Sequence, residues 1–99
     1  MFNRFLLGVI EVKPEVKKAL GRTPLDLVAR HAVCEFGGIS REQFAANCES
    51  LDCADEIISE YNAAPTKPKF RRIRITTIAG WGRTRVELIK LKFQHFCHR

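Results

Sequence analysis

The sequence contains no long hydrophobic run. Its longest apolar stretch, Phe5 to Ile10, has six residues and is followed by Glu11. A membrane-spanning helix needs about 20 apolar residues, and the apolar centre of a signal peptide needs about 7–15. We therefore predict a protein that works in the cytoplasm and does not bind membranes.

Catalytic and nucleotide-binding motifs are also missing. The chain has no G-x-G-x-x-G segment and no P-loop. His31 and Cys34 are spaced to meet across one helical turn, but a cysteine nucleophile also requires an electropositive pocket and a third group that orients the base. The sequence shows neither of these, so we predict that the protein is not an enzyme.

The four cysteines lack the spacing of a structural zinc site. Cys34, Cys48, Cys53 and Cys97 include no C-x2-C pair, which such sites usually have. An even number of cysteines also fits disulfides, yet without a secretion signal reduced thiols are the better expectation. The first three lie among apolar residues, so we predict small buried hydrophobic side chains, with no metal and no cofactor.

The chain does have a globular composition and an excess of positive charge. Of its 99 residues, 45% are hydrophobic and 28% are charged, and the net charge is +6. This composition predicts one folded domain rather than a disordered chain. The pI near 9.5 indicates an anionic partner, either nucleic acid or an acidic protein surface.

Helical patterns cover most of the first two thirds of the chain. Pro14 in a first turn and Gly21 at the end frame a short helix. Thr23 is suited to cap a second helix that has Pro24 in its first turn. The apolar face of that helix would comprise Leu25, Val28, Ala29, Ala32 and Phe36, with Gly37 and Gly38 ending it.

Capping signals predict a third helix. Ser40 and Gln43 have the spacing of a capping box. A further turn or a continuation to about Tyr61 would bury Ile57, Ile58 and Tyr61 at helical spacing. Residues 1–12, by contrast, fit a helix and a strand equally well, and both remain open.

The periodicity changes after residue 70. Residues 70–78 alternate, with Ile73 and Ile75 on one side and arginines on the other, as in a half-buried strand with a basic face. Residues 79–83 are typical of a turn. Residues 84–97 fit both a strand and a helix, and the capping-box spacing of Thr84 and Glu87 favours the helix.

Together these patterns predict an α+β fold: a mainly helical small single domain with a short basic strand or hairpin near the C-terminus. The helical part covers about 14–62, a proline arm 63–69, and the basic strand and tail 70–99. Pro65 and Pro68 cannot continue the preceding helix, because proline lacks an N–H donor and clashes with the previous turn. In a flexible arm their peptide bonds also populate the cis form, which makes the arm a docking site for a host peptidyl-prolyl isomerase.

Charge is divided sharply along the chain. Residues 40–62 have a net charge of −5, and residues 63–99 have a net charge of +9. One interpretation is a solvated surface with internal acid–base pairs. The other is a dipolar binding protein whose basic end meets an acidic or phosphate-bearing surface, with weak non-specific DNA binding at low salt.

A helix-turn-helix DNA-binding regulator is the alternative function. Two helices joined by a glycine turn have suitable lengths, and Arg41, Gln43 and Asn47 are residue types that contact base edges. However, Glu42 and Glu49 would face phosphates that a DNA-binding helix must neutralise. The electrostatics therefore count against this alternative.

The segment "APTKPKFRRIR", in a short basic chain without a catalytic motif, resembles the small anti-RecBCD proteins of lambdoid temperate phages. The resemblance is an overall likeness over most of the chain. It implies a non-enzymatic protein that binds the host RecBCD helicase–nuclease through its RecC subunit. The bound protein would alter RecBCD activity in favour of phage recombination.

The residues that we assign to partner binding follow the proline arm and the basic strand. They are Pro65, Lys67, Pro68, Lys69, Phe70, Arg71, Arg72, Arg74, Trp81, Arg83 and Arg85. Trp81 lies between two glycines, where it is either an exposed interface anchor or part of the core.

Overall fold

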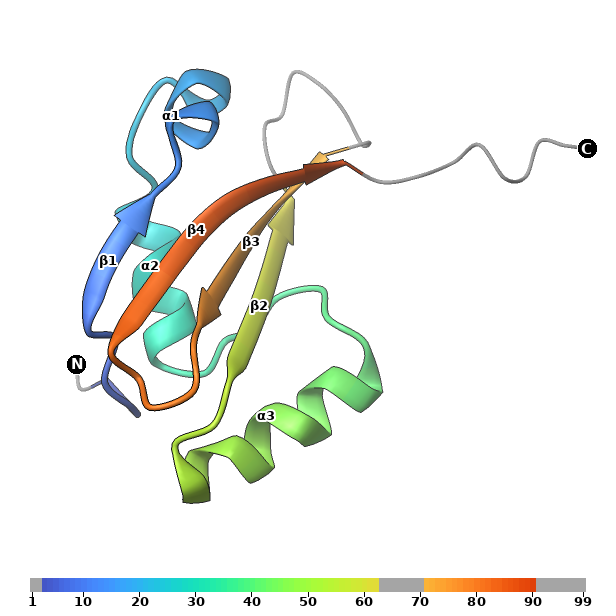
Figure 1. Ribbon diagram of the computed structural model, residues 1–99. Helices are drawn as coiled ribbons and strands as arrows, with labels where there is room; N and C mark the ends of the chain where they lie inside the picture. Colours follow the sequence, from blue (N-terminus) through green and yellow to red (C-terminus); the bar gives the residue numbers. More distant parts are fainter. Residues whose placement is uncertain (1–2, 63–70, 91–99) are drawn as a thin grey trace, which may run out of the picture.

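A four-stranded mixed sheet forms the centre of the molecule (Figure 1). The computed structural model describes residues 3–62 and 71–90. The strands are β1 (Val9–Val12), β2 (Ile57–Asn62), β3 (Arg71–Thr77) and β4 (Arg83–Lys90), in the spatial order β1-β4-β3-β2. Strand β1 is parallel to β4, and the other two pairings are antiparallel.

Three helices flank this sheet: α1 (Pro14–Leu20), α2 (Leu25–Ala32) and α3 (Arg41–Cys53). Helices α1 and α2 contribute Val16, Leu27 and Val28 to the core against one face of the sheet. Helix α3 lies beside β2 at the opposite edge from β1 (Figure 1). None of the helices in 3–62 and 71–90 is long and apolar enough to cross a membrane.

The fold is α+β, but the prediction of a mainly helical domain with only a C-terminal strand or hairpin is wrong. Residues 57–62 form a strand rather than a helix. Ala54, in the left-handed conformation at φ 54°, ends α3 and starts the turn into β2. Along β2 the side chains of Ile57, Ser59 and Tyr61 are buried alternately, so the strand period prevails over the helical spacing.

The helix favoured for residues 84–97 is also wrong over its described part, because β4 extends from Arg83 to Lys90. Thr84 does not cap a helix. Its hydroxyl is fully buried and donates to the Leu7 carbonyl at 2.7 Å. Val86 and Leu88 both face the core, which only the strand period allows. Residues 91–97 lie outside the described part of the chain.

The short helix and the start of the third helix are confirmed. Helix α1 begins at Pro14 and ends before Gly21, which takes φ 72° and donates its N–H to the Lys17 carbonyl. Ser40 caps α3 by accepting the Gln43 N–H at 3.0 Å. Of residues 1–12, for which helix and strand remained open, Val9–Val12 form strand β1, and residues 3–8 form neither a helix nor a strand.

Helix α2 differs from its prediction in cap and in face. Pro24, not Thr23, is at the N-cap, and no side chain caps the helix. Leu25 is 62% exposed, whereas Leu27 and His31 are buried. The inward face is therefore rotated, because the sheet offers His31 hydrogen-bonding partners that compensate for burying a polar ring.

These partners form a chain of buried polar groups beneath α2. His31 Nδ1 lies 2.5 Å from Ser59 Oγ, and its Nε2 lies 2.9 Å from Thr77 Oγ1. The Thr77 and Thr84 hydroxyls are 2.7 Å apart. Since Thr84 gives its proton to the Leu7 carbonyl, Thr77 donates to Thr84 and His31 Nε2–H donates to Thr77. Ser59 then donates to Nδ1, which requires a neutral imidazole.

Candidate partner-binding face

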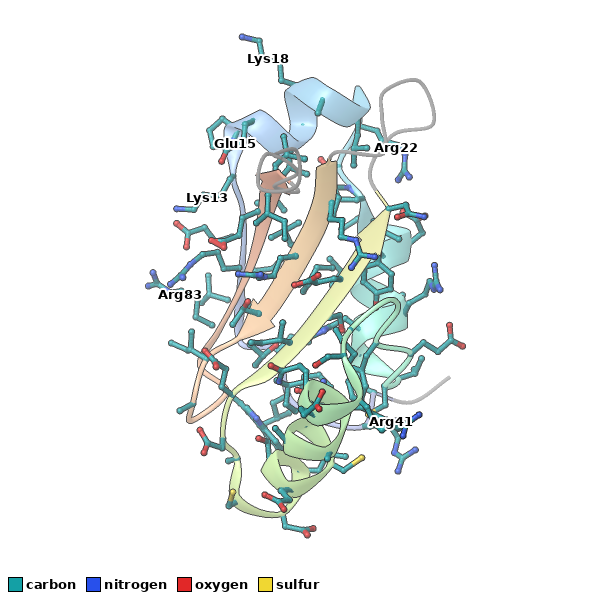
Figure 2. The ribbon with its side chains drawn as sticks, turned by 90° about the vertical axis from the view of Figure 1, so that its right-hand side faces the viewer. Lys13, Glu15, Lys18, Arg22, Arg41 and Arg83 are labelled. Atoms are coloured by element: carbon teal, nitrogen blue, oxygen red, sulfur yellow. The ribbon has the colours of Figure 1, made fainter. Side chains whose placement is uncertain are left out.

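The two faces of the sheet differ in character. One face carries the core, with Ile73, Ile75 and Val86 fully buried beneath α1 and α2. The other face, which we call the open face, carries the alternate residues of every strand. On β3 and β4 these include Arg72, Arg74, Arg83 and Arg85. Figure 2 shows Lys13 and Arg83 pointing away from α2 on this side.

The structure brings only part of the predicted binding set together. Arg72, Arg74, Arg83 and Arg85 share the open face. Arg71 begins β3, and nothing is described of its side chain. Pro65, Lys67, Pro68, Lys69 and Phe70 lie outside the described residues, as does the proline arm as a whole.

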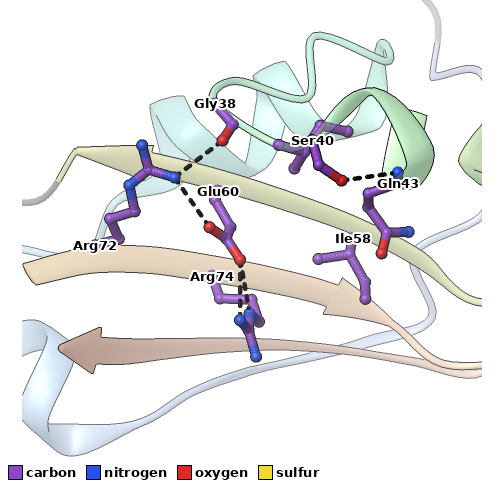
Figure 3. A pocket seen from close by; sticks show the side chains of 8 residues that line it. Gly38, Ser40, Gln43, Ile58, Glu60, Arg72 and Arg74 are labelled. Atoms are coloured by element: carbon purple, nitrogen blue, oxygen red, sulfur yellow. Dashed lines mark hydrogen bonds and ion pairs between the residues drawn. The ribbon is translucent and has the colours of Figure 1, made fainter. Parts of the chain in front are cut away.

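Two of the four arginines are already bound to an acidic residue. Glu60 on β2 accepts from Arg72 Nη1 at 3.0 Å through Oε1, and from Arg74 Nη2 at 2.9 Å and Nε at 3.1 Å through Oε2 (Figure 3). Arg72 Nη1 also donates to the Gly38 carbonyl at 2.9 Å. Glu60 and Arg74 are cross-strand partners, so the cluster links β2 to β3.

This cluster lines a cleft of about 510 Å³ between β2, β3 and the start of α3 (Figure 3). Its other walls come from Gly38, Ser40 and Gln43. The two guanidinium groups share a single carboxylate, so the cleft keeps a net positive charge. The internal pairing that the sequence offered as one interpretation of its charge division is thus present at Glu60.

The other two arginines, Arg83 and Arg85, form weaker ion pairs or none among the described residues. Arg83 Nη1 lies 3.7 Å from Glu11 Oε1, with 52% of its side chain exposed. Glu11 is shared with Lys13 at 4.0 Å. No ion pair of Arg85 is formed within 3–62 and 71–90, although Glu11 is its register partner on β1. Long contacts between exposed groups of this kind contribute little to stability, which leaves these charges free for a partner.

Trp81 is half-buried and packs against the core instead of standing on the open face. Its indole N–H donates to the Asp55 carbonyl at 2.9 Å, and its ring centroid lies 5.5 Å from that of Phe5. Trp81 has φ 57°, which turns the side chain back over the cluster of Phe5, Phe36 and Ile57. Of the two alternatives open for Trp81, this geometry matches the core residue.

Two of the three residues proposed to contact bases are used inside the molecule, whereas Arg41, the first residue of α3, is exposed. Asn47 is fully buried, where its Nδ2 donates to the Ile58 carbonyl at 2.8 Å and its Oδ1 accepts the Ile58 N–H at 3.1 Å. Gln43 Nε2 donates to the same Oδ1 at 2.9 Å. Asn47 therefore joins α3 to β2, and Gln43, which also lines the cleft, supports Asn47 from the preceding turn of the helix.

The sulfur and imidazole groups do not assemble on the open face. His31 is bonded to Ser59 and Thr77, and burial lowers its pKa to about 4. Burial raises the pKa of the half-buried Cys34 thiol, which keeps it protonated. Cys48 and Cys53 are exposed, so the prediction that they are buried hydrophobic residues is wrong, while Cys97 lies outside the described residues. Within the described ranges no group of His, Cys, Asp and Glu is arranged to hold a metal.

Sequence analysis missed the acidic members of the open face. Glu11 and Glu60 were counted only as charge, yet each is adjacent to two basic side chains. The alternation of Glu60 with Ser59 and Tyr61 was the available signal, but it was assigned to a helix.

Comparison with known proteins adds no relative. No protein-family model matches the chain, and neither a curated protein nor a solved structure is significantly similar to it.

Proposed function

We propose that this protein is a non-enzymatic binding module whose open face engages an acidic protein surface. The observation that carries the proposal is the pair Arg83 and Arg85, two adjacent cations on a sheet face that α1 and α2 leave uncovered. The resemblance of "APTKPKFRRIR" to anti-RecBCD proteins supplies the identity of the partner. We propose host RecBCD, contacted through RecC in the host cytoplasm, with its activity altered in favour of phage recombination.

The distribution of charge supports a protein partner over DNA. The open face alternates arginines with Glu11, Glu60 and Glu87, and such a mixed pattern is complementary to a protein surface of mixed charge. A continuous phosphate backbone would face these carboxylates unfavourably. DNA binding is accordingly proposed only as a weak, non-specific interaction at low salt.

We also propose that a host peptidyl-prolyl isomerase docks at the proline arm. Pro65 and Pro68 lie outside the described residues, and docking of a host peptidyl-prolyl isomerase there rests on the sequence alone. It is tested by whether such an enzyme is recovered with the tagged protein from an enterobacterial lysate.

A charge-removal experiment tests the proposed face. Arg83→Gln combined with Arg85→Gln removes two charges from the open face without burying a polar group. Its matched control, Lys18→Gln with Arg22→Gln, removes two charges near α1, far from Arg83 (Figure 2). We expect the open-face variant to lose about tenfold or more in RecBCD recovery at moderate salt, as for truncated interface arginines, and the control to behave like wild type.

The same preparations measure function. RecBCD nuclease activity and its response to Chi should change with wild-type protein and with the control, but less with the open-face variant. Absence of all RecBCD subunits from a clean pull-down refutes the partner. Enrichment of one defined duplex site near physiological salt would instead favour the DNA-binding alternative.

A further inference from the structure

The two edge strands of the sheet, β2 and β1, differ in whether their outward backbone groups are hydrogen-bonded. On β2 every outward backbone group of Ile58 and Glu60 is paired. Asn47 binds both the N–H and the carbonyl of Ile58. Glu60 donates to the Phe36 carbonyl at 3.0 Å and accepts from the Gly38 N–H at 2.8 Å. An edge protected in this way cannot pair with another strand.

The β1 edge lacks this protection. Val9 N–H donates to the Gly82 carbonyl at 3.1 Å, and Lys13 N–H donates to the Val86 carbonyl at 3.0 Å. Because backbone groups alternate along a strand, those of Ile10 and Val12 point away from β4. Among 3–62 and 71–90 no group is hydrogen-bonded to them on that side. No helix lies beyond this edge of β1 in Figure 1.

Apolar side chains are exposed at the same edge. On β1, Val9 is 66% exposed and Ile10 is 41% exposed. A single exposed apolar residue is ordinary, but two neighbouring ones on an edge strand with unpaired backbone groups form a template for strand addition.

The neighbouring charges define the strand that this edge accepts. On the open face, Val9 lies beside Arg83 in the β1–β4 register. An added strand therefore places a carboxylate opposite Val9 within reach of a long, exposed arginine, and a second carboxylate opposite Lys13. The position opposite Glu11 takes a neutral side chain. On the core side, aliphatic residues of the added strand would cover Ile10 and Val12.

We propose that β1 accepts an extended segment of the partner as a fifth strand, with carboxylates at alternate positions of its open-face side and aliphatic residues on the other. This inference rests on the proposed function and deepens it, because the added strand continues the open face next to Arg83. Main-chain hydrogen bonds supply the affinity, and the alternating side chains supply the selectivity.

Amide hydrogen exchange tests the pairing directly. The probe is the blocked peptide Glu-Val-Thr-Val-Glu with glycine flanks, and the control is the same peptide with lysine in place of glutamate. With the first peptide, the outward amides of Ile10 and Val12 should exchange about tenfold or more slowly. The amides of Val9 and Lys13, already bonded to β4, should change little. Peptide-induced shifts without protection at Ile10 and Val12 overturn the proposal, as does equal binding of the lysine peptide.

A substitution at one outward amide gives an independent test. In the backbone, Ile10→Pro removes only an N–H that points away from β4, and proline is tolerated at such edge positions; the substitution also removes the isoleucine side chain. Ile10→Thr is the matched control, since it shortens the side chain and keeps the donor. We expect Ile10→Pro to weaken peptide binding about tenfold and Ile10→Thr to stay within about threefold. Equal affinities of the two variants refute strand addition, and if Ile10→Pro does not fold, the exchange data on wild type decide.

The two proposals fail in distinguishable ways. If Arg83→Gln with Arg85→Gln loses RecBCD while Ile10→Pro retains it, the open face stands and strand addition falls. If sedimentation shows a wild-type dimer that Ile10→Pro converts to a monomer, the edge pairs with a second copy of the chain, which also overturns the proposed occupant.

Discussion

Protonation of His31 should set the acid stability of the fold. The imidazole is fully buried among Ser59, Thr77 and the ring of Phe5, whose centroid lies 5.2 Å away. Burial lowers its pKa from 6.5 to about 4. Between these values the unfolded chain binds a proton that the folded protein does not, so acid favours unfolding. The stabilising effect of the neutral ring is complete above pH 6.5 and is lost as the pH falls toward 4.

The size of the effect follows from the two pKa values. Linkage gives a loss of about 2 kcal/mol in unfolding free energy between pH 7.5 and pH 5. For a domain of this size, that corresponds to a fall in Tm of about 8–16 °C. Exposed carboxylates also titrate toward the lower end of this range, so the informative quantity is the difference between wild type and a variant that lacks the titrating group.

His31→Gln supplies that variant. Glutamine is neutral and can form hydrogen bonds, but it does not reproduce the fit of the imidazole, so we expect a lower unfolding free energy at pH 7.5. Because glutamine does not titrate, the unfolding free energy should decline much less toward pH 5. Urea unfolding at several pH values measures both slopes. Parallel slopes for wild type and His31→Gln would refute the argument. An NMR titration of wild type gives a check that does not depend on the variant folding: the ring should stay neutral, with its proton on Nε2, down to about pH 4.

Two further predictions concern the connections of α3. Asn47→Ala leaves the N–H and carbonyl of Ile58 without their side-chain partner, and we expect a loss of about 2–4 kcal/mol in urea unfolding; a loss under about 0.5 kcal/mol would show that water replaces the amide. Ala54→Gly relieves a non-glycine residue at φ 54°, so we expect a gain of up to about 1 kcal/mol by thermal unfolding, and a loss would contradict the assigned conformation.

Local signals predicted those elements whose ends are determined by local contacts. Ser40 and Gln43 gave the start of α3 because the cap bond joins residues only three positions apart. Pro14 and Gly21 bracketed α1 for the same reason. Ile73 and Ile75 gave β3 because its arginines contrast strongly with the buried isoleucines. In each case the pattern needs no knowledge of the rest of the fold.

Strands β2 and β4 were not predicted because some of their buried positions carry polar residues, which interrupts the alternation of apolar and polar side chains. Ser59 and Thr84 are fully buried and look like surface positions in the sequence. They can be buried because His31, 28 positions before Ser59, bonds to Ser59 directly and is linked to Thr84 through Thr77. Without that non-local partner, the spacing of Ile57, Ile58 and Tyr61 favours a helix. The error on the inward face of α2 has the same origin, because that face carries His31.

The prediction of a helix at residues 57–62 also affected which charged residues were expected to be unpaired. If Glu60 lay on a helix, as the helical spacing predicts, the acidic segment would be separate from the basic one and every arginine of the strand would be available to a partner. In the sheet, Glu60 stands opposite Arg74 and binds Arg72 as well. Removing Glu60 from the acidic segment and these two arginines from the basic one leaves an acidic α3 surface on one side. Among the described basic side chains of β3 and β4, it leaves Arg83 and Arg85, which lie on the strand next to β1. The proposed recognition surface therefore lies at β1 and β4, where unpaired backbone groups, exposed apolar side chains and Arg83 and Arg85 occur together.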